Sequence, residues 1–180
     1  MSLVYIFLAN GFEEVEGLTA VDLLRRAGCD VKTVSIMDRR VVTGSHQIKV
    51  IADIMFDDIK DEADLVVLPG GLPGTNYLRD HKGLAALLQA RYEKGALIAA
   101  ICAAPSVFEG LGFLKDRQAT SYPGAIGEAT GEYLTTPVVV SDHVITSRGV
   151  GTAIPFALKL IEILCGAEKA NEIESSILYK

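Results

Sequence analysis

The sequence predicts an α/β fold in which helices cover both faces of a mostly parallel β-sheet. Continuous apolar runs of strand length alternate with amphipathic segments of helix length, and the connections between them are short. Hydrophobic residues make up 49% of the chain and the mean hydropathy is +0.31, yet no apolar run reaches the roughly 18 residues that span a bilayer. Strands buried on both faces explain this combination, because helices cover a parallel sheet on each side.

In the first half of the chain, short apolar runs mark the strands and apolar residues at helical spacing mark the helix. Leu18, Val21 and Leu24 recur on one helical face, and Gly28 follows as a C-cap. In segment 41–52, apolar and polar residues alternate only weakly, so this segment is interpreted as a hairpin or edge excursion. The expected elements are strand 3–8, helix 17–27, strand 31–36 and hairpin 41–52.

In the second half, the apolar runs are followed by clear stop signals. Leu84 and Leu88 face inward in one long helix that Gly95 ends, and Asp142-His143 separates two short strands. The expected elements are strand 65–68, helix 76–93, strand 97–101, helix 105–111, paired strands 138–140 and 144–146, and closing helices 152–165 and 167–178.

Length and charge restrict the class of protein. The 180 residues fit a single domain over 1–180, with no linker or internal repeat. Seventeen basic against 23 acidic residues give a formal charge of −6, which disfavours a dedicated nucleic-acid surface. The opening run 3–8 is too short for a signal peptide and no basic segment precedes it. We therefore expect a cytoplasmic protein without a membrane partner.

The cysteines and histidines show no pattern of a metal site or a disulfide framework. The three histidines share no helical spacing, and no CxxC motif is present, so we expect neither a metal nor an organic cofactor. An odd number of cysteines without close pairing indicates reduced thiols. The cysteines are Cys29, Cys102 and Cys165.

Three segments carry unusual residues at the carboxyl ends of predicted strands, where open α/β sheets bind their ligands. Cys102 stands between a strand and a helix that begins at once, and the small residues Ala103 and Ala104 permit a sharp turn such as a nucleophile elbow. A buried cysteine that packs as a small hydrophobic residue is the alternative. The segments are 10–16 (NGFEEVE), 69–74 (PGGLPG) and 99–105 (AAICAAP).

The other two segments offer partners for that cysteine. Gly70-Gly71 would leave backbone N–H groups open, as an oxyanion hole requires, and a tight turn that demands positive φ is equally compatible. A phosphate-binding loop is a third reading, but the GxGxxG and GxxxxGK patterns are absent. Glu16, placed in a loop after the first strand, would point into the same cleft. Its alternative is a solvated acid at a helix start.

Six segments, in order along nearly the whole chain, carry a family resemblance. They are 11–16 (GFEEVE), 21–28 (VDLLRRAG), 68–71 (LPGG), 99–105 (AAICAAP), 120–123 (TSYP) and 146–152 (TSRGVGT). Together they resemble the ThiJ/PfpI superfamily, in the branch of the Parkinsonism-associated protein (DJ-one) and its bacterial ThiJ/YajL-like relatives. The resemblance implies a flavodoxin-like three-layer sandwich that forms a homodimer.

The resemblance also implies roles for individual residues. Cys102 would be the nucleophile and a redox-sensitive thiol, and Glu16 would form a hydrogen bond with its sulfur. The backbone N–H groups of Gly71 and Ala103 would form the oxyanion pocket. Further candidates for the pocket are Gly70, Tyr122 and Arg148.

The activities of the family include glutathione-independent glyoxalase and protein deglycase chemistry. The expected function is therefore that of a cofactor-free cysteine enzyme whose partner is a small dicarbonyl or a glycated substrate. A non-enzymatic oxidative-stress sensor or redox-regulated chaperone is the second reading. A member with a thiamine-pathway label or with amidase or peptidase activity is the third.

Three positions depart from the family pattern. The protease branch has histidine directly after the cysteine, where this chain has Ala103, which argues against a peptidase. Tyr122 stands where close relatives carry histidine, and tyrosine is a poor base at neutral pH. His46 replaces a frequent arginine, so an anion site there would be weaker or pH-dependent.

A nucleophilic role for Cys102 requires an ionised thiol. Lowering a thiol pKa from about 8.5 to about 6 needs about 3.4 kcal/mol of preferential stabilisation of the thiolate. A helix N-terminus supplies about 0.5–2 kcal/mol. A protonated carboxyl would add to this, whereas a carboxylate would oppose it. We therefore expect a neutral Glu16 with a raised pKa beside a Cys102 with a lowered one, and lower reactivity at Cys29 and Cys165.

Overall fold

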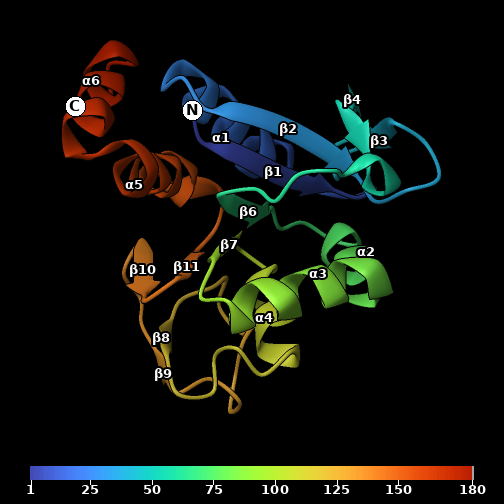
Figure 1. The fold of residues 1–180 in the computed structure, drawn as a ribbon. Coiled ribbons are helices and arrows are strands. Elements are labelled where there is room, and N and C mark those ends of the chain that lie inside the picture. Colours follow the sequence, from blue (N-terminus) through green and yellow to red (C-terminus); the bar gives the residue numbers. More distant parts are fainter. Residues whose placement is uncertain (180) are drawn as a thin grey trace.

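The computed structural model describes residues 1–179, in which seven strands form one sheet with helices on both faces (Figure 1). The strand order is β10-β11-β7-β6-β1-β2-β5, and all neighbouring strands are parallel except β10 and β11. The strands are β1 (Leu3–Leu8), β2 (Asp30–Ser35), β5 (Ile54–Met55), β6 (Leu65–Leu68), β7 (Leu97–Ile101), β10 (Val138–Ser141) and β11 (Val144–Ser147).

The helices form two outer layers around this sheet. They are α1 (Glu14–Arg26), α2 (Gly74–Asp80), α3 (Lys82–Glu93), α4 (Pro105–Gly110), α5 (Ala153–Cys165) and α6 (Ala167–Ser176). Helices α1, α5 and α6 lie on one side of the sheet, and α2, α3 and α4 lie on the other (Figure 1). The predicted three-layer sandwich is confirmed.

Each face of the sheet has its own hydrophobic core, because successive side chains of a strand point to opposite faces. Ile6 of β1 belongs to the core beneath α1 and α5, together with Phe156. Phe7, the next residue, belongs to the core beneath α3 and α4, together with Phe108. All four side chains are fully buried, and each contributes about 1.5–3 kcal/mol through the removal of apolar surface from water.

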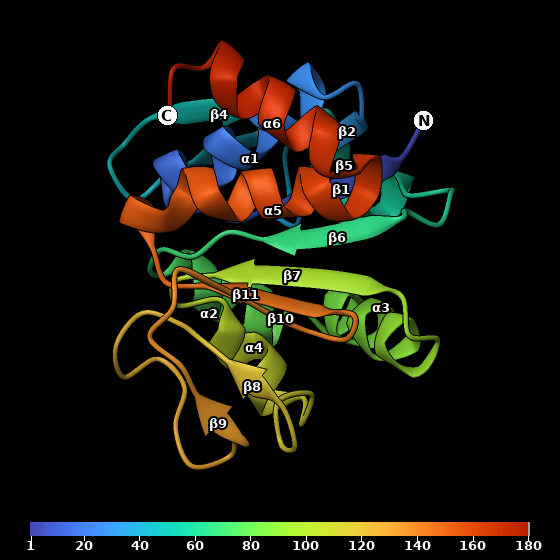
Figure 2. The ribbon, with the colours of Figure 1, turned by 90° about the vertical axis from the view of Figure 1, so that its left-hand side faces the viewer.

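Two small strand pairs lie outside the main sheet. The predicted hairpin is present as β3 (Val41–Thr43) and β4 (Lys49–Ile51), which pair antiparallel. A parallel pair that the sequence analysis missed consists of β8 (Gln118–Ala119) and β9 (Glu132–Tyr133). Figure 2 shows this pair beyond the β10–β11 side of the sheet. Strands of two residues leave no periodic pattern in a sequence, and β5 was missed for the same reason.

The single helix predicted over 76–93 is wrong, because the chain forms two helices there. His81 adopts an extended conformation (φ −80°, ψ 102°) between α2 and α3. Its Nδ1 accepts a hydrogen bond from the N–H of Leu84 at 2.9 Å, which caps α3. Leu78, Leu84 and Leu88 are all buried, so the apolar spacing continues across the break and conceals it.

Within the described part of the chain, no helix has both the length and the apolar character needed to cross a bilayer. The longest helices, α1 and α5, have 13 residues each.

Candidate active site

The candidate site lies at the carboxyl ends of the strands, next to β1, where the chain connections run to opposite sides of that strand. From β1 the chain passes through α1 to β2 on one side, whereas β6 lies on the other side of β1. Such a switch point opens a crevice at the carboxyl ends of the strands. The structure brings the three segments singled out in the sequence together at this edge, since they follow β1, β6 and β7.

Cys102 occupies a sharp turn directly after β7. Its φ of +65° is in the left-handed region, which costs a residue with a Cβ on the order of 1–3 kcal/mol. Two backbone hydrogen bonds hold the turn in place. The N–H of Cys102 donates to the carbonyl of Ser147 at 3.0 Å, and its carbonyl accepts from the N–H of Tyr122 at 2.8 Å. The side chain is half-buried and stands before α4, as a nucleophile elbow requires.

Glu16 lies in the first turn of α1, so its predicted place in a loop is wrong. The helix begins early because the side chain of Glu13 accepts from the N–H of Val15 at 3.3 Å and caps it. This start directs Glu16 inward, where it is 1% exposed. Its Oε2 accepts a hydrogen bond from the N–H of Gly70 at 2.9 Å. The alternative of a solvated acid is thereby excluded.

Gly70 packs closely against both Glu16 and Cys102, and Gly71 forms the adjoining turn. A Cβ on Gly70 would lie 2.6 Å from the Cβ of Cys102 and 2.8 Å from Oε2 of Glu16, so only glycine fits there. Gly71 has a φ of +90°, as a tight turn requires. The N–H groups of Ala103 and Gly71 act as hydrogen-bond donors toward the sulfur of Cys102. The oxyanion pocket expected from these two N–H groups stays a prediction.

The carboxyl of Glu16 is strongly perturbed. Burial disfavours its charged form and raises its pKa to about 7, while hydrogen bonding with Cys102 and with the N–H of Gly70 acts in the opposite direction. The second oxygen, Oε1, is buried and has no hydrogen-bond partner. Oε1 lies 3.9 Å, and the sulfur 3.8 Å, from the point that a Cβ on Gly149 would occupy. The expected raised pKa is therefore present, and the thiol lies beside the carboxyl.

The thiol of Cys102 shows the opposite of the expected shift. Burial and then the negative charge of Glu16 raise its pKa to about 12, and the N–H groups of Ala103 and Gly71 only partly offset this. The expectation of a lowered thiol pKa assumed an exposed sulfur beside a neutral acid. In the structure, half-burial removes water from the thiolate, and an ionised Glu16 repels it. The pair holds one proton between them above pH 7 and two below.

The perturbed carboxyl predicts a stability that depends on pH. Between the ordinary pKa of 4.5 and the folded-state pKa of about 7, the unfolded chain releases the proton of Glu16 and the folded chain keeps it. Stability therefore falls as pH rises through this window, by about 3 kcal/mol in all. We expect the free energy of unfolding of Glu16→Gln, relative to that of wild type, to increase by about 3 kcal/mol from pH 4.5 to pH 8, as measured by urea unfolding. A difference between the two proteins that does not vary with pH would contradict the buried carboxyl.

Tyr122 and Gly149 lie near the sulfur of Cys102, and Arg148 directly precedes Gly149 in the chain. The ring of Tyr122 is 58% exposed, and its Cδ2 is 3.8 Å from the Cβ position of Gly149. Gly149 was quoted in a motif but not recognised as a site residue. It leaves space in front of the sulfur that a side chain would fill. Arg148 is half-buried, and its Nε is buried without a hydrogen-bond partner.

The three histidines serve other contacts. His81 caps α3, and the ring of His143 packs against Tyr92, 5.0 Å between ring centroids. His46 contacts the carboxylates of Glu13 and Glu14 at 3.3 and 3.1 Å. The hydrogen bond to Glu14, followed by the charges of Glu13 and Glu14, raises the pKa of His46.

The cluster of Glu13, Glu14 and His46 has the donor types of a metal site, and its ligand atoms lie within 4.8 Å of one another. The imidazole of His46 already contacts both carboxylates, and so does the hydroxyl of Ser45. The cluster leaves no signal in the sequence, because a glutamate pair and a histidine 32 positions apart show no ligand spacing.

Taken together, the chain is an α/β protein with a strained cysteine turn and a buried carboxyl at the carboxyl edge of its sheet. It belongs to the DJ-1/PfpI family, whose model matches residues 2–163. Among curated relatives, Protein DJ-1 homolog A of Arabidopsis thaliana is 39% identical over 98% of this chain, which spans only 46% of that relative's length. Protein dj-1beta of Drosophila melanogaster is 39% identical over 96% of this chain and 95% of its own.

A third relative is named for an activity, and two solved structures share the fold. Glutathione-independent glyoxalase DJR-1.2 of Caenorhabditis elegans is 35% identical over 89% of this chain and 87% of its own. The crystal structure of Drosophila melanogaster DJ-1beta has a TM-score of 0.94, 38% identity and covers 99% of this chain and 98% of its own. Toxoplasma gondii DJ-1, oxidized, has a TM-score of 0.92, 36% identity and coverages of 99% and 98%. The predicted superfamily and flavodoxin-like fold are confirmed.

Proposed function

We propose that the protein is a cysteine-dependent enzyme that converts reactive dicarbonyls, or their adducts, to hydroxy acids without a cofactor. The observation that carries the proposal is the juxtaposition of a thiol with a buried carboxyl whose pKa is about 7. A group that titrates near the working pH suits general acid–base catalysis. The relative named as a glutathione-independent glyoxalase supports the same reaction class.

In the first step, the sulfur of Cys102 attacks the aldehyde carbon of methylglyoxal. The carbon–sulfur bond forms, the π electrons of the carbonyl move to its oxygen, and the thiol proton passes to Glu16. The thiol therefore needs no ionisation beforehand, and its raised pKa is compatible with attack. The N–H groups of Gly71 and Ala103 are placed to stabilise the resulting oxyanion.

In the second step, Glu16 returns its proton to the oxyanion and becomes a base again. It then removes the proton from the former aldehyde carbon. Return of that proton to the neighbouring carbon, with transfer of the hydroxyl proton to the neighbouring oxygen, gives a lactoyl thioester on Cys102. Water cleaves the carbon–sulfur bond and releases lactate and the thiol. The sum is methylglyoxal plus water giving lactic acid, so the reaction needs no external oxidant or reductant.

The test measures lactate formed from methylglyoxal by the purified chain, with EDTA present and glutathione absent. We expect lactate well above the level with heat-denatured protein, and no stimulation by added glutathione. A rate equal to that of the denatured control would refute the proposal. Supplying a preformed methylglyoxal adduct of N-acetylcysteine distinguishes the substrate. If lactate forms faster than the adduct dissociates spontaneously, the enzyme acts on the adduct and is a deglycase. If lactate forms no faster than the adduct dissociates, the substrate is the free dicarbonyl.

The other readings receive less support from the site. An oxidation sensor requires a readily ionised thiol, and burial raises the pKa of Cys102. A peptidase dyad would need a histidine beside the sulfur, and the histidines engage other partners. Addition of two oxygen atoms to Cys102 under mild peroxide, with no dicarbonyl turnover, would favour the sensor. A homodimer stays a prediction.

A further inference from the structure

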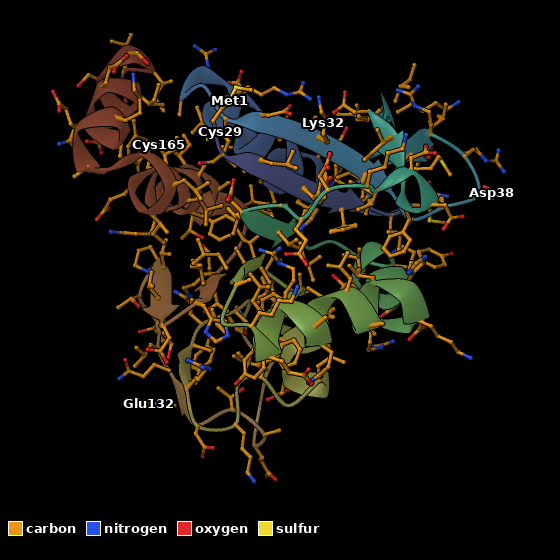
Figure 3. All side chains as sticks on the ribbon, viewed as in Figure 1. Met1, Cys29, Lys32, Asp38, Glu132 and Cys165 are labelled. Carbon is orange, nitrogen blue, oxygen red and sulfur yellow. The ribbon has the colours of Figure 1, made fainter. Side chains whose placement is uncertain are left out.

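Cys29 and Cys165, which are 136 positions apart in the sequence, meet on the side of the molecule formed by α1, α5 and α6 (Figure 3). Their sulfur atoms are 3.6 Å apart, and both thiols are free. The expected reduced thiols are present, and the packing of α5 against α1 brings two of them together. We propose that Cys29 and Cys165 form a second redox site, separate from Cys102, that closes to an intramolecular disulfide on reaction with a peroxide.

The backbone at Cys29 and the backbone at Cys165 are fixed by different contacts. Cys29 follows α1 at a turn in which its N–H donates to the carbonyl of Leu24 at 3.1 Å, and its side chain belongs to the core beneath α1 and α5. Cys165 is the last residue of α5 and is followed by Gly166, whose φ is +90°. A helix end before a glycine turn can adjust locally. A disulfide bond of about 2 Å requires the two sulfurs to approach from their separation of 3.6 Å.

The two thiols also differ chemically, in a way that assigns each a role. Cys29 is 7% exposed, and burial followed by the contact with Cys165 raises its pKa to about 12. Cys29 therefore keeps its proton at neutral pH. Cys165 is exposed, so a dissolved oxidant reaches it first.

The reaction balances with hydrogen peroxide as the oxidant. The Cys165 thiolate attacks one peroxide oxygen, so that a sulfur–oxygen bond forms, the oxygen–oxygen bond breaks and hydroxide leaves. The sulfur of Cys29 then attacks the Cys165 sulfenic acid. A sulfur–sulfur bond forms, the sulfur–oxygen bond breaks, and the departing oxygen takes the proton of Cys29. Two thiols and one peroxide give one disulfide and two molecules of water.

The bond would join the end of α5 to the connection between α1 and β2. It would close a loop of more than a hundred residues, which restricts the unfolded chain strongly. Neither cysteine is part of the Cys102 site, so this inference does not depend on the proposed function.

The experiment uses the Cys102→Ala variant, so that any oxidation is confined to the other two cysteines. After mild hydrogen peroxide treatment, we expect the intact mass to fall by two hydrogen atoms, and proteolysis without reductant to give one peptide pair that links Cys29 to Cys165. The Tm should rise by about 5 °C or more and return on reduction with dithiothreitol.

The matched control is Cys102→Ala/Cys165→Ser, a further change at an exposed position. Peroxide should neither cross-link this protein nor raise its Tm. Addition of oxygen atoms to Cys165 without a cross-link would overturn the proposal, and so would a disulfide between Cys165 residues of two copies. In the wild-type chain, a cross-link from either cysteine to Cys102 would overturn the claim of a separate site.

Discussion

Cys102→Ala is expected to lower the rate of lactate formation from methylglyoxal by at least about 10³-fold, to near the uncatalysed rate. The sulfur forms the covalent bond to substrate in the proposed reaction, and no other group of the site can replace it. Glu16, Gly71 and Ala103 would still surround the substrate, but they stabilise an intermediate that no longer forms. The measurement is kcat/KM for lactate production at pH 7.5.

The substitution leaves the fold unchanged, which makes the activity loss interpretable. Cysteine and alanine both carry a Cβ, so the conformational cost at φ +65° is the same for both. Far-UV circular dichroism and Tm should therefore stay close to those of wild type. Cys165→Ser is the matched control, because it removes an exposed thiol away from the site. Equal activity of Cys102→Ala and wild type would exclude a cysteine mechanism.

The sequence predicted the layers of the fold because they depend on patterns that repeat along the chain. Apolar runs such as 65–68 and 97–101 became β6 and β7 with the same bounds. The break at His81 was concealed, since it depends on one side chain capping α3 and not on apolar spacing. The position of Glu16 was missed for a related reason, because a cap at Glu13 starts α1 earlier than the apolar pattern indicates.

The residue types of the candidate site were also accessible from sequence, but its electrostatics were not. Cys102 and Glu16 were selected by their positions after strands and by the family resemblance. The direction of each pKa shift depends on burial and on the separation of the two groups, which only the packed structure defines. The contact between Cys29 and Cys165 likewise arises from the packing of α5 on α1, which no local pattern reports.

Glu16→Gln is expected to lower kcat/KM for methylglyoxal by about 10²- to 10⁴-fold, which is the usual contribution of a general base. Glutamine has the shape of glutamate and retains an oxygen that can accept from the N–H of Gly70, but it cannot take the thiol proton. In the wild type, kcat/KM should rise with pH through an apparent pKa of about 7, as the second proton leaves the Cys102–Glu16 pair. In Glu16→Gln this rise of kcat/KM with pH should be absent.

The same variant tests the sign of the interaction between the two groups. The charge of Glu16 raises the pKa of Cys102, so its removal should lower the thiol pKa. If Glu16 stabilised the thiolate as a neutral donor, its removal would raise that pKa instead. Thiolate absorbance at 240 nm, corrected with Cys102→Ala, measures the direction.

Glu13→Gln is the matched control for this prediction. The charge of Glu13 makes the smallest of the named contributions to the raised pKa of Glu16. This variant should therefore keep most of the rate, while the midpoint of its pH profile moves slightly downward. A thiol pKa and a pH profile that both stay unchanged in Glu16→Gln would show that the carboxyl and the sulfur do not share a proton, and the acid–base step would then need another residue.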